Sequence, residues 1–544
     1  MTSERAATAE RVEPGDPTTA QRPAGGLVGL FGTGDHKAIG RLFIGASTLF
    51  LALVGTTGVL LGAERLQVGT LDVLDTDSFS QVYSLHWVST IFLFVLPFLL
   101  GIALVVVPLQ VGARTVAFPR AAAASFWLWL LSSGLVLAGY AINGGLFGGD
   151  YDGVSLFLAA FAVLIVALCL TTVCVVTTVL TLRTTGMTLD RTPLFAWSML
   201  VAGSVWLLTL PVLFGLVVLS YLDWRYGVTG DPTEFGRATF DRFRWAWEQP
   251  QIWVYAVPAL GLAADVAAVF AGARQRNRGV LMGAIGAAGV LGVGAWTFTR
   301  PENPNLVEEA LFVAVAVAVV LPVLAVLGGV GQTLMRGKMK LGSPLVFALT
   351  GLLMVLTGAG AGALGAIEAL DLQFRVGGET TWSTGVFHYV VGGTVLVAIG
   401  GLHHWASKLF GRPLREGPAK LAATLGVLGT IGLALPELIA GALDQTAVLP
   451  QSARDGVEAL NLVSLVGGGL LVLTILIVVL NVIGSLSRRG YDEAVDADPW
   501  EGQTLEWLTA SPPGPGNFAE LPVVTSAAPL LDQREREIEQ VTSP

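Results

Sequence analysis

The chain has 544 residues, of which 53% are hydrophobic and only 13% are charged, with a mean hydropathy of +0.69. Soluble domains carry about 25% charged residues, so this composition excludes both a soluble globular protein and a disordered one. A formal net charge of -9 leaves no basic surface for nucleic acid, and two cysteines, Cys169 and Cys174, form neither a disulfide framework nor a thiolate metal cluster.

The N-terminal residues 1–35 are polar and rich in Pro, Thr and Gly, and they lack the apolar core of a signal peptide. We predict a disordered cytoplasmic arm here. Residues 36–487 form a series of apolar runs, each near the length of about 20 residues that crosses a bilayer, and they predict a twelve-helix transmembrane domain. The runs are 38–62, 81–110, 121–143, 154–182, 194–221, 250–271, 279–299, 308–335, 344–370, 383–407, 418–443 and 458–485.

The orientation follows from the 31 Lys and Arg residues, most of which lie in segments on the same side as the N-terminus. Because positive loops stay inside, we expect both termini in the cytoplasm and the protein in the cell membrane. Residues 488–544 form a second polar segment, rich in Asp and Glu, which predicts a cytoplasmic C-terminal tail.

Two of the five histidines lie at matching depths in separate runs. His86 and His388 each come about five residues into a run that starts outside, roughly 8 Å below the membrane edge. Ionisable residues inside a bilayer indicate function, and two facing imidazoles can hold one haem iron from both sides, which carries one electron at a time. The alternative is a pair of unrelated, hydrogen-bonded core histidines.

The other three histidines have simpler interpretations. His403 and His404 fall near the inner end of their run, beside Lys408, and we interpret them as interfacial or structural. His36 stands between Asp35 and Lys37 before the first run, which is typical of a surface or capping residue.

Several motifs resemble the subunit I family of haem–copper respiratory oxidases, in order and spacing, over roughly residues 35–523. They are Asp35–Gly40, Val107–Arg114, Ala117–Arg120, Ser125–Trp127, Phe387–Val390, Asp498–Trp500, Thr504–Trp507, Ser511–Pro513 and Asn517–Phe518. The resemblance implies an all-α membrane protein with a twelve-transmembrane-helix bundle. It also implies that His86 and His388 are the low-spin haem ligands, and that other oxidase-like membrane subunits and a cytochrome c or quinol-linked electron donor are partners.

The same resemblance exposes departures at the oxygen-reducing centre. The high-spin haem ligand position is Val386, and the copper histidine, the proton-carrying Glu and the Tyr of the sixth helix are replaced by Gln249, Gln251 and Trp253. The seventh-helix histidine pair is absent near Trp296. Excluding His36, the chain has four histidines for the six imidazoles that such a centre needs.

The family's proton routes and propionate clamp are also altered. Thr115 and Val326 occupy the positions of an acidic entry residue and a lysine, and the arginine pair that binds haem propionates falls near Glu437 and Leu438. This last change weakens the haem assignment, because the carboxylates lose their clamp; Arg300 is a possible substitute.

These observations predict a membrane electron-transfer subunit with one low-spin haem, of type a or b, held by His86 and His388, and with no copper. Such a chain is not an oxidase by itself and has no catalytic residues of its own. Two alternatives stay open: an active, proton-pumping terminal cytochrome c oxidase, and a haem-free scaffold or assembly subunit.

Overall fold

The computed structural model describes residues 32–66, 73–227, 232–248, 251–294, 305–367, 370, 372, 374–375, 378–449, 456–487 and 498–542. Within these residues, twelve long helical segments follow one another. They are α2 (His36–Glu64), α3–η2–α4 (Thr76–Val88, Ser89–Val95 and Leu96–Gln110), α5 (Pro119–Ala141), α6 (Tyr151–Thr181), α7 (Leu194–Tyr226), α9 (Ile252–Ala271), α10 (Arg278–Gly294), α11–α12 (Leu306–Ala318 and Val320–Arg336), α13 (Ser343–Gly365), α14 (Thr381–His404), α16 (Glu416–Ala442) and α17 (Glu458–Leu486).

Short elements connect or follow these helices. They are η3 (Leu189–Arg191), α8 (Pro232–Phe243), η4 (Arg244–Ala246), the antiparallel pair β1 (Phe374–Arg375) and β2 (Gly378–Glu379), α15 (Ala406–Phe410), η7 (Leu505–Leu508) and α18 (Pro529–Thr542).

The prediction of an all-α transmembrane bundle is confirmed, and the helical segments follow the twelve predicted runs in order. Within the described residues, eleven segments are long and apolar enough to cross a membrane, and α10 is a shorter apolar helix. The run that predicted α10 extends to residue 299, beyond the described part of that helix.

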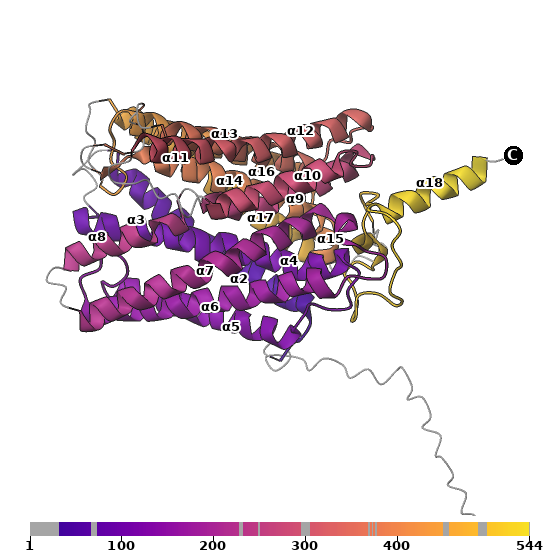
Figure 1. Ribbon diagram of the computed structural model, residues 1–544, viewed down its shortest axis with the longest axis horizontal. Helices are drawn as coiled ribbons and strands as arrows, with labels where there is room; N and C mark the ends of the chain where they lie inside the picture. Colours follow the sequence, from indigo (N-terminus) through magenta and orange to yellow (C-terminus); the bar gives the residue numbers. More distant parts are fainter. Residues whose placement is uncertain are drawn as a thin grey trace, which may run out of the picture.

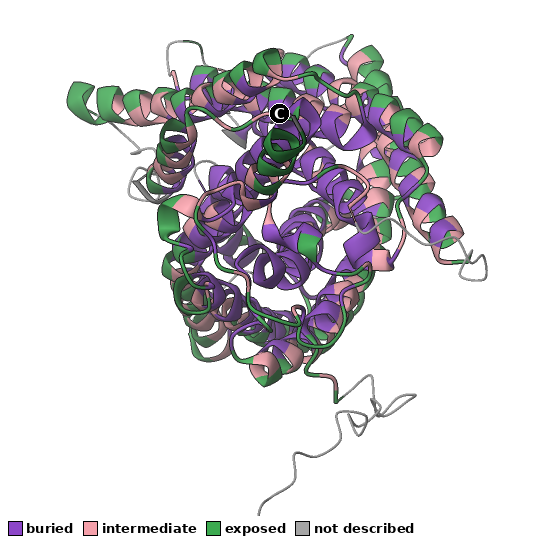
Figure 2. Ribbon diagram, turned by 90° about the vertical axis from the view of Figure 1, so that its right-hand side faces the viewer, coloured by how far each residue is buried: buried purple, intermediate pink, exposed green. Residues whose placement is uncertain are grey.

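The helices lie side by side along the long axis of the bundle (Figure 1). Seen from one end, buried residues fill the centre and exposed residues form the rim (Figure 2). The apolar windows of α3–η2–α4 and α9 are completely buried, whereas only 22% of the residues in those of α2, α11–α12 and α17 are buried. A helix that is apolar on all sides is stable only at the centre of a bundle or against lipid, and the chain uses both environments.

Close helix packing explains much of the high glycine content. At the crossing of α2 and α4, a Cβ atom on Gly40 would lie 2.6 Å from the Gly101 carbonyl oxygen, and one on Gly101 would lie 2.9 Å from that of Gly40. Gly351 and Gly393 approach each other in the same way between α13 and α14, at 2.5 Å in both directions. Small residues let membrane helices gain dispersion contacts along their backbones.

The C-terminal segment 498–542 covers the end of the bundle at which α2 begins, which we call the tail end; the opposite end is the far end (Figure 1). The interpretation of His36 as a surface residue is wrong. Its side chain is buried, with Nδ1 2.6 Å from the Leu104 carbonyl oxygen and Nε2 3.2 Å from Oδ1 of Asn517. The tail supplies the covering that the local sequence around His36 does not reveal.

Candidate functional site

His86 and His388 meet between two helices of the bundle core. His86 lies on α3 and His388 on α14. Their Nε2 atoms are 3.5 Å apart, and the ring centroids are 5.8 Å apart with the planes inclined at 71°. The structure thus brings together the two histidines that the sequence placed at one depth.

The other nitrogen of each ring has its own partner. His86 Nδ1 is 2.9 Å from the Thr57 hydroxyl on α2, and that hydroxyl already donates to the carbonyl oxygens of the preceding turn at Leu53 and Val54. Nδ1 of His86 therefore donates to Thr57. His388 Nδ1 donates to Oε2 of Glu437 on α16 at 2.6 Å, which is short, as expected for a bond to a carboxylate.

From these partners we assign both rings to the tautomer with Nδ1 protonated. With Nδ1 protonated on both rings, each Nε2 carries a lone pair, and the two lone pairs face each other. A donor set of this kind suits an electron-deficient centre between the rings. Metal–imidazole bonds are about 2 Å long, so two ligands in line stand about 4 Å apart, and the pair needs to open by about 0.5 Å.

Neighbouring residues hold the His86 ring in place. A Cβ atom on Gly58 of α2 would lie 3.2 Å from Cε1 of His86 and 3.7 Å from Nδ1, so the absence of a side chain there lets the ring approach the helix. Beside the pair, Trp87 and Phe387 pack with ring centroids 3.9 Å apart. The site is thus an apolar, aromatic setting with two directed nitrogen donors.

A buried arginine lies at the far end of the same region. Arg65 follows α2 directly, and its guanidinium donates to the Ala447 carbonyl oxygen at 2.5 Å and lies 5.4 Å from the Phe79 ring centroid. Its Nε is buried and has no partner among the described residues. An unpaired buried N–H costs free energy, and a carboxylate of a bound group would satisfy it. The donor set and this arginine fit a haem.

The positions at which the resemblance implies oxygen chemistry are buried where they are described. Val386 and Trp253 are buried, and Gln251 donates to the Thr209 hydroxyl at 3.0 Å. Gln249, Trp296 and Arg300 lie outside the described residues. Within the described part of the chain, no group of three or more His, Cys, Asp or Glu side chains is arranged to hold a metal ion.

His403 and His404 lie near the other end of α14, away from the pair. Both are buried, and His403 Nδ1 is 2.9 Å from the Ile399 carbonyl oxygen. His404 packs against the rings of Trp405 and Trp507. Their surroundings agree with a structural role.

Sequence reasoning missed Glu437 and Thr57 as partners of the histidines. Glu437 had been interpreted only as the loss of an arginine. The signal for Glu437 was its place inside an apolar run, because a carboxylate buried in a membrane span requires a polar partner. Helix periodicity, however, does not show which other helix supplies that partner.

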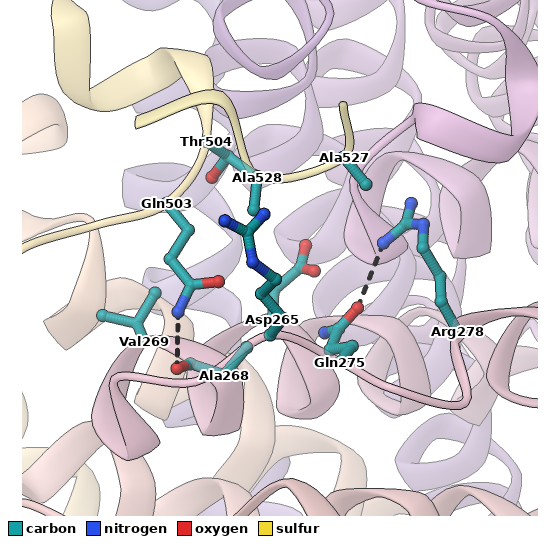
Figure 3. Close-up of a pocket in the computed structure, with 10 residues that line it drawn as sticks. Asp265, Ala268, Val269, Gln275, Arg278, Gln503, Thr504, Ala527 and Ala528 are labelled. Carbon is teal, nitrogen blue, oxygen red and sulfur yellow. Dashed lines mark hydrogen bonds between the residues drawn. The ribbon is translucent and has the colours of Figure 1, made fainter. Parts of the chain in front are cut away.

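A separate cavity of about 130 Å³ lies at the tail end (Figure 3). Asp265 lines it, together with Arg274 and Gln503. The Asp265 carboxylate accepts from the backbone N–H groups of Leu194 and Phe195, at 3.0 and 2.9 Å. Asp265 thus caps α7 from the neighbouring helix α9, and the cavity is not part of the histidine site.

Comparison with known proteins establishes the family. Residues 38–470 match the family described as Cytochrome C and Quinol oxidase polypeptide I. The chain belongs to this family.

Relatives within the oxidase subunit I family cover most of the chain. Cytochrome c oxidase subunit 1 of Bacillus subtilis strain 168 is 28% identical, covering 92% of this chain and 82% of the relative. Quinol oxidase subunit 1 of the same organism is 27% identical, covering 93% and 80%. Heme-copper oxidase subunit I+III of Aeropyrum pernix is 30% identical over 90% of this chain and 61% of that longer one.

A solved structure supports the fold. A heme-copper terminal oxidase dimer determined by cryo-EM superposes with a TM-score of 0.64, covering 92% of this chain and 89% of its own, at 16% identity. The oxidase subunit I fold is therefore shared at this low identity.

Proposed function

We propose that the chain is a membrane electron-transfer subunit of the oxidase subunit I family that holds one low-spin haem between His86 and His388, with no oxygen-reducing haem–copper centre. The observation that carries the proposal is the pair of Nε2 atoms, 3.5 Å apart, with both Nδ1 atoms committed to other partners.

The haem would supply one-electron transfer, and the protein residues define how. His86 and His388 would both bind the haem iron, and a haem held by two protein ligands would have no free position for oxygen. The apolar packing around Trp87 and Phe387 excludes water, and Arg65 would bind a haem carboxylate through its unpaired Nε. The residues thus bind, orient and insulate an electron carrier.

The proposed partners follow from the family. The names of relatives include a cytochrome c oxidase subunit and a quinol oxidase subunit, and we propose a cytochrome c or a quinol-linked protein as the electron donor. Other oxidase-like membrane subunits would complete the complex, in the cell membrane, with both termini in the cytoplasm.

The test is the stoichiometry of iron, copper and haem in the full-length protein, purified in detergent, together with a reduced-minus-oxidised spectrum. The proposal expects one iron as low-spin haem per chain, no copper, and no spectral change with carbon monoxide. Copper beside a carbon-monoxide-reactive haem would identify a terminal oxidase. A chain without haem that still binds other oxidase-like subunits would identify a scaffold, and either result overturns the proposal.

A further inference from the structure

The two imidazoles of the site have unequal partners. Glu437 accepts from His388 at 2.6 Å, whereas His86 has only the neutral hydroxyl of Thr57, at 2.9 Å. Glu437 is buried, with a side-chain exposure of 8%, so water screens its charge little. One axial ligand is thus paired with an anion and the other is not.

We propose that Glu437 is a positioning residue that sets the reduction potential of the site through His388, an inference that rests on the proposed function. A carboxylate that accepts from Nδ1–H pulls this proton partly away from the ring, which increases the negative charge on the imidazole and makes Nε2 a stronger donor. A stronger anionic donor stabilises ferric iron relative to ferrous iron, so Glu437 lowers the potential at which the site accepts an electron.

The fold holds Glu437 in position for this task. It follows Pro436 within α16, and its backbone carbonyl oxygen accepts from the Thr381 hydroxyl on α14, at 2.9 Å. The same pair of helices is therefore joined twice, once through the backbone near the start of α14 and once through the carboxylate at His388. This arrangement keeps the carboxylate oxygen directed at Nδ1 rather than at solvent.

Arg65 is the nearby cation that partly offsets the carboxylate. Its guanidinium interacts electrostatically with Glu437, but it donates a hydrogen bond to the Ala447 carbonyl oxygen. The carboxylate thus accepts its short hydrogen bond from the imidazole, while the arginine acts on it only through space. The charge effect of Glu437 on the ligand is reduced by Arg65 but not cancelled.

The test is a redox titration of the full-length protein in detergent, comparing wild type, Glu437→Gln and Glu64→Gln. Glu64 is a matched control, because it is buried at the same end and bonds the backbone N–H groups of Val73 and Leu74 instead. We expect Glu437→Gln to raise the midpoint potential. If the variant prefers ferric over ferrous iron ten times less strongly than wild type, the potential rises by about 59 mV. The control should leave the potential unchanged.

A ferric low-spin electron paramagnetic resonance spectrum gives a second measurement, since the g values follow the donor strength of the axial ligands. Changed g values in Glu437→Gln, but not in Glu64→Gln, support the proposal. A wild-type potential and spectrum in a haem-loaded Glu437→Gln chain overturn it and leave the proposed function intact. If the wild-type chain holds no haem, the proposed function itself fails, and this inference with it.

A variant that keeps the charge covers the case in which Glu437→Gln does not retain haem. Glu437→Asp keeps the carboxylate but shortens its reach to Nδ1. A haem-loaded Glu437→Asp chain with a potential above wild type supports the proposal, and an unchanged potential overturns it.

Discussion

Two buried glutamates, one in the His86–His388 site and one at the tail end, lie in different surroundings. Glu437 accepts one short bond from an imidazole, at 2.6 Å. Glu506, at the tail end, accepts from the Gln110 amide and the Trp405 indole, both at 3.2 Å, and its Oε2 has no partner among the described residues. Burial raises the pKa of Glu506 to about 7.

The difference shows how the donor decides the role of a buried acid. An imidazole shares charge with its carboxylate and passes the effect to whatever its second nitrogen binds. Amide and indole donors stabilise a carboxylate weakly. Burial of such a group therefore favours the protonated carboxylic acid over the charged carboxylate. The first glutamate is suited to tune a ligand, and the second to respond to pH.

The largest expected effect, and the strongest test of the role given to Glu437, comes from removal of the two imidazoles. We expect His86→Ala and His388→Ala each to abolish the low-spin haem spectrum, because one remaining axial ligand does not hold a six-coordinate site. His403→Ala is the matched control, since it removes a buried histidine of the same α14 helix. The measurement is haem content per chain; full haem in both site variants would refute the assignment.

A smaller effect tests the carboxylate that caps α7. Asp265→Ala leaves the N–H groups of Leu194 and Phe195 without an acceptor, which costs on the order of 1–3 kcal/mol. We expect a lower midpoint of thermal unfolding in detergent. Glu520→Ala, at an exposed position, should leave the midpoint unchanged, and equal midpoints in the two variants would contradict the capping role.

The pH response of Glu506 sharpens the comparison further. Its pKa is about 7 in the folded chain, against 4.5 for the free side chain, so the folded state binds the extra proton between these values. The free energy of unfolding therefore falls as the pH rises from about 4.5 to 7 and loses no more above that range. Glu506→Gln should flatten this part of the profile.

The control for Glu506 is a glutamate of the same tail. The Lys340 ammonium beside Glu501 lowers the pKa of that carboxyl, so Glu501→Gln should leave the slope between pH 5 and 7 as in wild type. Thermal unfolding midpoints at several pH values measure both variants. A wild-type slope in Glu506→Gln would count against the assignment.

The smallest effect concerns the glycine beside His86. A methyl group at Gly58 would lie 3.2 Å from Cε1 of His86, so Gly58→Ala should displace the ring by a few tenths of an ångström and shift the haem absorption bands slightly, at a cost of about 1 kcal/mol. Gly45→Ala, where a Cβ atom meets nothing within 4 Å, is the control. Identical spectra in both variants would show that the ring has room to spare.

The sequence predicted the bundle well because hydropathy alone defines membrane spans. It also predicted which histidines share a depth, since a rise of about 1.5 Å per residue converts position into height. The sequence did not show which faces of neighbouring helices meet. Glu437 was interpreted as a lost arginine, although it bonds His388. Pairing between helices depends on the rotation of each helix about its axis, which periodicity does not fix.

Local context also misled the interpretation of His36. It stands between charged residues, but its covering comes from Asn517, far along the chain. A distant segment, absent from the local pattern, thus determines its exposure.

The contact of Asn517 with the start of α2 has a consequence for folding order. Asn517 accepts from the Lys37 ammonium at 3.0 Å and donates to the Ala113 carbonyl oxygen at 2.9 Å, so it joins the first helix to a segment 480 residues later in the chain. The hydrogen bonds around the opening turn of α2 are therefore completed only when the C-terminal segment docks on the assembled bundle. Removal of the Asn517 side chain would leave the buried Lys37 ammonium without this acceptor.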